Sequence, residues 1–198
     1  MDVLAWAELK LEITSCERCN LSLTRKNTVF GMGNPGAGVL IIGEGPGQQE
    51  DEQGLPFVGK SGQLLDKILA ACGFNRQEHV FIANIVKCRP PDNRDPKPEE
   101  RQACIGYLMR QIELMQPKII ILLGRTALQG LIDPSLSITK LRGNWMMWNG
   151  IHVMPTYHPS ALLRNPNLKK DAWSDFKMII EKYIELIDCQ FTAPVQNH

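Results

Sequence analysis

The sequence predicts an α/β protein in three layers, α/β/α, with a central, mostly parallel, four-stranded sheet. Four apolar segments have the length and composition of buried strands, and a helical pattern follows each of them. This alternation is typical of a doubly wound sheet, because each helix returns the chain to start the next strand in the same direction. With 198 residues, 43% hydrophobic and 22% charged, the chain 1–198 is expected to form one domain.

The N-terminal residues 2–13 are expected to form a short amphipathic helix, with Leu4, Ala7 and Leu11 on its apolar stripe. A C-x-x-C pair, Cys16 and Cys19, follows. Such a pair occurs in redox, zinc and iron–sulfur sites. Because no strand precedes it, a metal clip is favoured over a thioredoxin-type motif.

The first strand is Val39–Gly43, and a glycine-rich loop that begins with Glu44 follows it. The glycines at 43, 45 and 47 do not match G-x-G-x-x-G, and Pro46 stands where a dinucleotide-binding loop would enter its helix. The loop supplies backbone N–H groups that can approach a ligand closely.

The segment Gly54–Ser61 matches the P-loop pattern G-x-x-x-x-G-K-S, so an NTPase is one alternative. Its interior is bulky, and a polar, acidic stretch precedes it where a P-loop needs a buried strand. The other interpretation is a loop into a helix over 62–72, with Ser61 as its N-cap and Lys60 near a DNA phosphate. Phe57 in this loop is either a buried plug or a stacking surface.

The second strand opens the segment Val80–Pro91 and carries two unusual residues. Asn84 places an amide in a segment that should be dry, where an unpaired polar group costs roughly 1–3 kcal/mol. Cys88 follows where the strand gives way to Arg-Pro-Pro. One short segment therefore offers an amide that can bind a polar ligand and a thiol that can bind a metal.

The rest of the chain completes the alternation of helices and strands. Cys104 lies on the inward face of the next helix, as a core residue or as a ligand if other cysteines converge. Cys72 is expected to be a core thiol. The remaining elements are a helix from Pro98 to about Met115, a strand over 118–123, a helix through Leu131, a strand over 152–157 and a helix over about 171–187.

Three polar residues lie close to the carboxyl ends of predicted strands: Glu44, Asn84 and His158. In open α/β sheets, ligands bind in the crevice beyond that edge. We therefore expect the three side chains to converge on one site.

The net charge of +1 means that a nucleic-acid-binding surface would be a local patch. No window reaches the roughly 18 apolar residues of a membrane span, and the N-terminus does not resemble a signal peptide. We expect an intracellular, cytoplasmic protein without membrane association. In that setting the six cysteines are more typical of metal ligands or core residues than of disulfides.

These motifs, in this order, resemble the family 4 uracil-DNA glycosylases, the iron–sulfur branch of the uracil-DNA glycosylase superfamily. The similarity covers nearly the whole chain, and it accounts for the P-loop-like match. It rests on Cys16-x-x-Cys19, Gly43-Glu-Gly-Pro-Gly47, the Pro56–Leu65 segment, Asn84–Pro91, Cys104, His158-Pro-Ser160 and Leu162-Leu-Arg-Asn-Pro166.

The resemblance implies that a 4Fe-4S cluster is held by Cys16, Cys19, Cys88 and Cys104. We expect it to be structural and to orient basic residues such as Lys87 and Arg89 towards DNA. Structural zinc is the alternative for four thiolates.

The resemblance further implies a hydrolase that flips uracil out of DNA and breaks its N-glycosidic bond, leaving an abasic site for base excision repair. Phe57 would stack on the base, Asn84 would pair with its polar edge, and His158 would stabilise charge on O2. The backbone of Gly43, Glu44 and Gly45 would close around the base. Glu44 is the leading candidate to position water, with Glu50 and Asn93 in support.

The expected partner is uracil-containing DNA, single- or double-stranded, bound by a monomer. The turn Leu162-Leu163-Arg164 would wedge into the duplex, and Lys60 and Arg164 would contact phosphates together with Lys169 and Lys170. The alternatives are a module that binds uracil-DNA without cutting it and, second, an NTPase.

Overall fold

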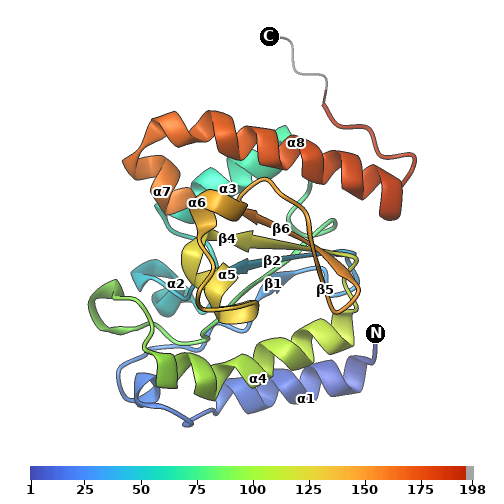
Figure 1. Ribbon diagram of the computed structural model, residues 1–198. Helices are drawn as coiled ribbons and strands as arrows, with labels where there is room; N and C mark the ends of the chain where they lie inside the picture. The colour runs from blue at the N-terminus through green and yellow to red at the C-terminus, as the bar shows by residue number, and fades with distance from the viewer. Residues whose placement is uncertain (195–198) are drawn as a thin grey trace.

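The computed structural model describes residues 1–194 as a sheet between two helical layers (Figure 1). The sheet has six strands in the order β1-β3-β2-β4-β6-β5. Its four central strands are parallel to one another: β3 (Phe81–Asn84), β2 (Val39–Gly43), β4 (Ile119–Leu123) and β6 (Ile151–Thr156). The predicted α/β class and the parallel core are confirmed.

Two short antiparallel strands at the edges correct the predicted number of strands. β1 (Met32–Gly33) pairs with β3, and β5 (Met146–Trp148) pairs with β6. A strand of two or three residues is too short to show an alternating pattern. The β5–β6 hairpin did leave a signal, because Asn149 and Gly150 both have positive φ and Asn-Gly favours such a turn.

The helical layers follow the expected order. Helices α1 (Val3–Thr14), α4 (Pro98–Met115) and α5 (Gly124–Leu131) cover one face of the sheet, and α3 (Lys60–Ala71) and α8 (Lys169–Leu186) cover the other. The smaller helices are α2 (Gln48–Gln53), α6 (Ile138–Leu141) and α7 (Pro159–Arg164), with 3₁₀ turns at Asn20–Leu23, Pro91–Asn93 and Pro166–Leu168.

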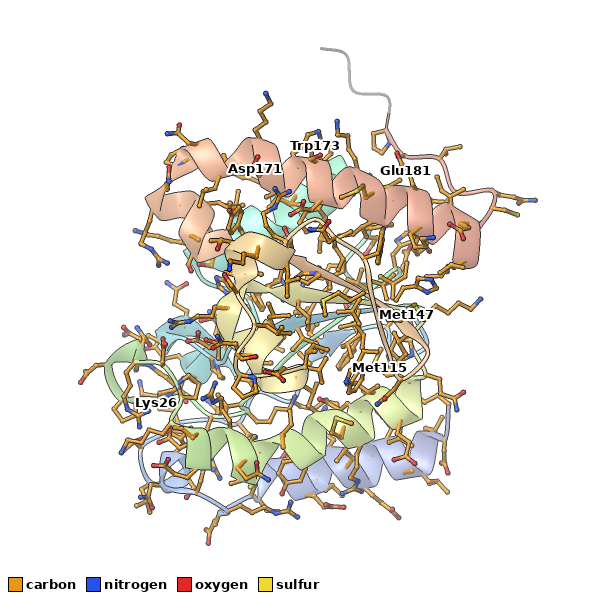
Figure 2. The ribbon with its side chains drawn as sticks, viewed as in Figure 1. Lys26, Met115, Met147, Asp171, Trp173 and Glu181 are labelled. Atoms are coloured by element: carbon orange, nitrogen blue, oxygen red, sulfur yellow. The ribbon has the colours of Figure 1, made fainter. Side chains whose placement is uncertain are left out.

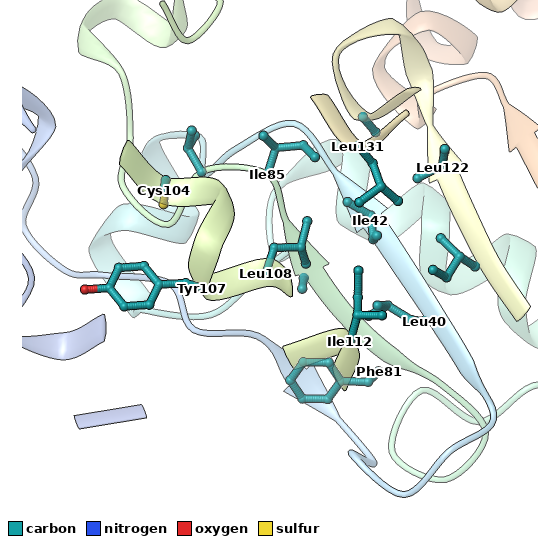
Figure 3. Close-up of a cluster of buried hydrophobic side chains, with 14 of the residues drawn as sticks. Leu40, Ile42, Phe81, Ile85, Cys104, Tyr107, Leu108, Ile112, Leu122 and Leu131 are labelled. Atoms are coloured by element: carbon teal, nitrogen blue, oxygen red, sulfur yellow. The ribbon is translucent and has the colours of Figure 1, made fainter. Parts of the chain in front are cut away.

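Side chains fill the space between the sheet and the helical layers on both sides (Figure 2), and along β2 they alternate between the two cores. Leu40 and Ile42 of β2 belong to the core on the α4 side, where they lie with Leu108 and Ile112 (Figure 3). Val39 and Ile41 belong to the opposite core. Because both faces of the central strands are buried, these strands are continuous apolar runs.

The first helix buries a different stripe from the predicted one. Leu4 and Leu11 are 77% and 70% exposed, whereas Leu9 and Ile13 are fully buried. Trp6 decides the orientation, because its ring packs edge-on at 5.1 Å from the ring of Phe30. Two apolar stripes were available at helical spacing, and the aromatic contact selected the second.

Within residues 1–194, no helix has the length and apolar character that crossing a membrane requires.

Candidate active site

A cleft of about 440 Å³ lies beyond the carboxyl ends of β2 and β3. This is the edge at which open α/β sheets bind ligands. Its walls come from the β2–α2 loop, the loop before α3, the end of β3, the loop before α4, and α7. The sequence-predicted residues that line it are Glu44, Gly45, Glu50, Phe57, Asn84, Asn93, His158 and Arg164.

The amide of Asn84 is buried at the end of β3 and faces this cleft. Among residues 1–194 its buried Oδ1 has no hydrogen-bond partner, which is rare for a side chain that is 1% exposed. Gly43 pairs with Asn84 across the strands, and a Cβ added to Gly43 would lie only 2.5 Å from Oδ1. The site thus holds an acceptor that awaits a donor.

Phe57 is 6% exposed, as a buried plug would be, and its ring also lines the same cleft. Its centroid lies 5.5 Å from that of His158. The backbone of Phe57 has φ 53°, a conformation that residues other than glycine rarely adopt. A Cβ on Gly62 would lie 1.9 Å from the Phe57 carbonyl oxygen, so only glycine allows this approach.

Two charged side chains hold the Phe57 loop from opposite sides. The guanidinium of Arg76 donates to the carbonyl oxygens of Pro56 and Phe57, the latter at 2.8 Å. Glu50 Oε1 accepts from the backbone N–H groups of Val58 and Gly59, each at 2.8 Å. Glu50 therefore holds the loop that leads into α3. The N-cap of α3 is Gly59 and not Ser61, and its cap position carries no side-chain hydrogen bond within residues 1–194.

The imidazole of His158 is held in one tautomer. The Ser160 backbone N–H donates to Nδ1 at 3.1 Å, so the proton of the neutral ring sits on Nε2. Burial lowers the pKa of His158 to about 4, with the positive charge of Arg164 acting in the same direction. The site therefore contains a neutral imidazole with an N–H donor at Nε2.

The carboxylate of Glu44 is half-buried at the end of β2. Burial raises its pKa, and a hydrogen bond from Thr126 opposes that rise. The Thr126 hydroxyl donates to Glu44 Oε2 at 2.5 Å. Thr126 lies 82 residues from Glu44 in the sequence, and no pattern pointed to it. A second cavity, of about 350 Å³, adjoins the cleft and is lined by Glu44, Thr126 and His158 among others.

Asn93, the second supporting residue, sits in the exposed turn at the rim of the cleft. It has φ 53°, and its Oδ1 accepts from Arg89 Nε at 2.8 Å. Its side chain therefore fixes the loop between β3 and α4 as well as lining the cleft.

The expected wedge is corrected at one position. Leu162 is 2% exposed and packs inward, whereas Leu163 is 46% exposed and Arg164 is exposed beside it. A buried side chain cannot enter DNA, so Leu162 anchors α7 and only its two successors face outward. Lys60 is exposed at the first turn of α3.

The P-loop-like segment is not built as a P-loop. Gly54 is the C-cap of α2, so a helix and not a strand leads into the pattern. A P-loop requires a buried strand at this point. The NTPase alternative is therefore excluded by the local topology.

All four predicted cluster cysteines line one cavity between α1, α4 and the end of β3: Cys16, Cys19, Cys88 and Cys104. Arg25 Nη1 contacts Cys88 Sγ at 3.4 Å, and the Lys87 backbone N–H contacts Cys104 Sγ at 3.3 Å. Burial raises the pKa of the Cys88 thiol to about 11, so a thiolate there needs further stabilisation, such as a metal. Across residues 1–194, no three His, Cys, Asp or Glu side chains gather around a single ion position.

The two other cysteines lie outside this cavity, whereas Lys87 lines it. Cys72 is fully buried in the opposite core, as predicted, and Cys189 is exposed. The expectation that Lys87 faces DNA is wrong. Its side chain is 1% exposed and points inward, because Nζ donates to the carbonyl oxygen of Asn84 and to Gln111 Oε1.

Comparison with known proteins adds the family. Residues 30–177 match the model of the uracil DNA glycosylase superfamily. The chain is 45% identical over 182 residues to the type-4 uracil-DNA glycosylase of Sulfurisphaera tokodaii, covering 88% of this chain and 83% of that protein. It is 50% identical over 155 residues to that of Thermotoga maritima, covering 77% and 80%. These matches, which extend over most of the chain, show that it belongs to the type-4 uracil-DNA glycosylases of the uracil-DNA glycosylase superfamily.

Proposed function

We propose that this chain flips uracil out of DNA, reads it with Asn84 and hydrolyses its N-glycosidic bond with the help of His158 and Glu44. The observation that carries the proposal is the buried, unpartnered Oδ1 of Asn84 facing the cleft. An unpaired buried acceptor is unfavourable unless a ligand completes it.

Uracil presents an N–H donor that can pair with Asn84 Oδ1. Oδ1 of Asn84 can accept from uracil N3–H, while the amide nitrogen can donate to O4. Cytosine has an acceptor at N3 and a donor at the neighbouring amino group, so it would leave both pairs mismatched. A site built to hydrogen-bond one polar edge rejects the opposite pattern strongly.

The base is held from its face by Phe57. Aromatic stacking contributes about 1–3 kcal/mol per base in single-strand binding proteins. Gly43 makes room for the base, since a Cβ there would lie 2.7 Å from the Phe57 ring as well as against the amide. The loop clamp of Arg76 and Glu50 keeps the ring in place.

His158 supplies the donor for the leaving group. As the C1′–N1 bond breaks, its electron pair moves onto uracil and negative charge gathers at O2. A neutral Nε2–H can donate to that oxygen without first losing a proton to solvent. Preorganised donors of this kind are worth roughly 2.7–4 kcal/mol in an oxyanion site.

Glu44 acts on the sugar and on the attacking water. Its carboxylate can stabilise the cationic sugar and take a proton from the water whose oxygen bonds to C1′. Thr126 holds the carboxylate in one orientation and favours its ionised form. Glu50 is occupied by two backbone N–H groups, which supports Glu44 and not Glu50 as the group next to water.

The outer surface supports a DNA contact beside the cleft. Leu163 and Arg164 are exposed on α7, and Lys60 is exposed at the start of α3. An apolar side chain with a neighbouring cation suits insertion into the gap left by the flipped base, with a phosphate contact beside it.

The four cysteines fit a 4Fe-4S cluster. In such a cluster each cysteine binds a different iron, so the sulfurs surround a volume, whereas one zinc draws its thiolates to about 2.3 Å from a single point. The four cysteines line one shared cavity, and the similarity to the type-4 uracil-DNA glycosylases favours the cluster over zinc. When bound, the cluster would cross-link the N-terminal segment, the end of β3 and α4.

The central test uses a labelled oligonucleotide with one uracil, a thymine control and alkaline cleavage after incubation. Breakage only at uracil supports the proposal. Asn84→Asp is expected to lose or shift base preference, and His158→Ala to slow turnover strongly. Wild-type rates in both variants would overturn the assignment of the site. A stable complex with uracil-DNA and no abasic product would favour a binding module instead.

The cofactor is tested separately by the iron, sulfide and zinc content of protein purified without oxygen. Cys104→Ser is expected to lower iron and sulfide together. Cys189→Ser is the matched control, because that thiol is exposed and outside the cavity. Zinc without sulfide in the wild-type protein would overturn the cluster.

A further inference from the structure

The ammonium group of Lys87 is the most unusual buried group in the part of the chain that the structure describes. Its side chain is 1% exposed. Nζ donates to the carbonyl oxygen of Asn84 at 3.0 Å and to Gln111 Oε1 at 2.6 Å. Gln111 in turn donates to the carbonyl oxygen of Phe30 at 2.9 Å. These contacts form a short polar chain inside an otherwise apolar core.

A buried ammonium is unfavourable unless charge and hydrogen bonds compensate it. In residues 1–194, Lys87 forms no ion pair with a carboxylate, and both of its hydrogen-bond acceptors are neutral. The groups beside it are sulfurs: Cys88 follows it in the chain, and its own backbone N–H contacts Cys104 Sγ. Four thiolates around a cluster would supply the missing negative charge.

One of the two acceptors of the Lys87 ammonium is the backbone carbonyl oxygen of Asn84, the residue proposed to bind uracil. Asn84 is the last residue of β3, where the chain leaves the sheet. Two hydrogen bonds continue the pairing past the strand ends: Ile85 N–H donates to the carbonyl oxygen of Gly43, and Val86 N–H donates to that of Glu44, just after β2. Lys87 Nζ then turns back to the Asn84 carbonyl. Asn84 therefore carries both the side-chain amide that lines the cleft and the backbone carbonyl that accepts from Lys87 Nζ.

We propose that Lys87 is a positioning residue of the uracil pocket: its buried ammonium locks the Asn84 peptide and so ties the orientation of the reading amide to the cysteine-lined centre. The inference rests on the proposed function of Asn84 and extends it. It gives the cysteine centre a role in base recognition in addition to holding the fold.

The first test compares Lys87→Met with wild type in single-turnover excision of uracil. Methionine keeps the apolar stem and removes both hydrogen bonds. The expected loss is roughly 10- to 100-fold, the size usual for a lost hydrogen bond to a charged group. Lys177→Met on the exposed face of α8 is the matched control and is expected to keep the wild-type rate.

A double-mutant cycle separates positioning from a general loss of structure. In an Asn84→Ala background there is no amide left to orient, so Lys87→Met is expected to change the residual rate by less than about threefold. Equal losses in both backgrounds would overturn the inference, and so would a wild-type rate in the single variant. Iron content and Tm are measured for each protein as readouts that are independent of activity.

If Lys87→Met fails to fold, Lys87→Met with Gln111→Leu replaces it. This double variant replaces both side chains of the buried Lys87–Gln111 pair by apolar ones. Apolar replacement of a buried polar pair is often tolerated. The double replacement is expected to fold and still lose rate, and a folded protein with the wild-type rate would overturn the inference. Failure of the proposed function looks different, because wild type itself would then not excise uracil.

Discussion

Replacing Thr126 by valine removes a hydrogen bond that holds the proposed water-positioning carboxylate of Glu44. Thr126 is 6% exposed, and its hydroxyl lies 2.5 Å from Glu44 Oε2. Valine has nearly the same shape but cannot donate. The carboxylate would lose its donor while keeping the burial that already raises its pKa. Removing a donor favours the neutral acid, so the pKa moves further up.

The magnitude follows from the type of bond. A short hydroxyl-to-carboxylate hydrogen bond is charge-assisted, and losing a hydrogen bond to a charged group costs about 1.5–3 kcal/mol. If that bond is needed in the transition state, single-turnover excision should slow roughly 10- to 100-fold. The acidic limb of the pH–rate profile should move to higher pH, because more of Glu44 would be protonated at any given pH.

The assay is single-turnover excision from a uracil oligonucleotide across a pH series. Thr126→Ser is the matched control, since it keeps the hydroxyl and should retain a rate within about threefold of wild type. Two results would refute the reasoning. One is a wild-type profile in Thr126→Val, and the other is an equal loss in Thr126→Ser, which would point to packing and not to the hydroxyl.

Three further outcomes are expected. Gly43→Ala should abolish excision and lower Tm by a few degrees, because the new Cβ would lie 2.5 Å from the amide oxygen of the pocket and buried side chains must shift, while Gly106→Ala inside α4, with nothing within 4 Å of the added Cβ, should keep the wild-type rate without lowering Tm. The ring nitrogens of His158 should show a neutral, Nε2-protonated imidazole by NMR from about pH 8 to about pH 5, since burial lowers its pKa to about 4, and a titration near its ordinary value would contradict this. Leu163→Ala should slow excision from duplex DNA more than from single-stranded DNA at unchanged Tm. Leu162→Ala, at a buried position, should instead cost about 2–5 kcal/mol of stability. The reverse pattern would show that Leu162 is the residue that enters the duplex.

The fold was predictable where a strand is buried on both faces, because such a strand is a continuous apolar run in the sequence. The runs at Val39–Gly43 and Ile119–Leu123 are buried on both faces, and such runs have few other interpretations. The edge strands were missed, because two or three residues carry no periodicity. The Asn149-Gly150 turn shows that a local signal existed for one of them.

The site was predictable to the level of residue types and strand ends. Glu44, Asn84 and His158 do line one cleft, as the parallel topology requires. Their partners were not predictable, because Thr126 and Arg76 have no motif and act through contacts between segments distant in sequence. The same limit explains why Glu50 could be named but its hydrogen bonds to the Phe57 loop could not.

By itself, therefore, the sequence determined the parallel core, because long apolar runs in alternation with helical patterns have few other interpretations. The set of four cysteines and the residues proposed to bind uracil came from the resemblance to a known family, whose motifs the chain carries in order. Only the tertiary structure decided which stripe of α1 is buried, that Leu162 points inward and Leu163 outward, and that Lys87 turns into the core. Periodicity defines the faces of an element, but the surface that covers a face comes from elsewhere in the chain, so its choice is a property of the packed whole.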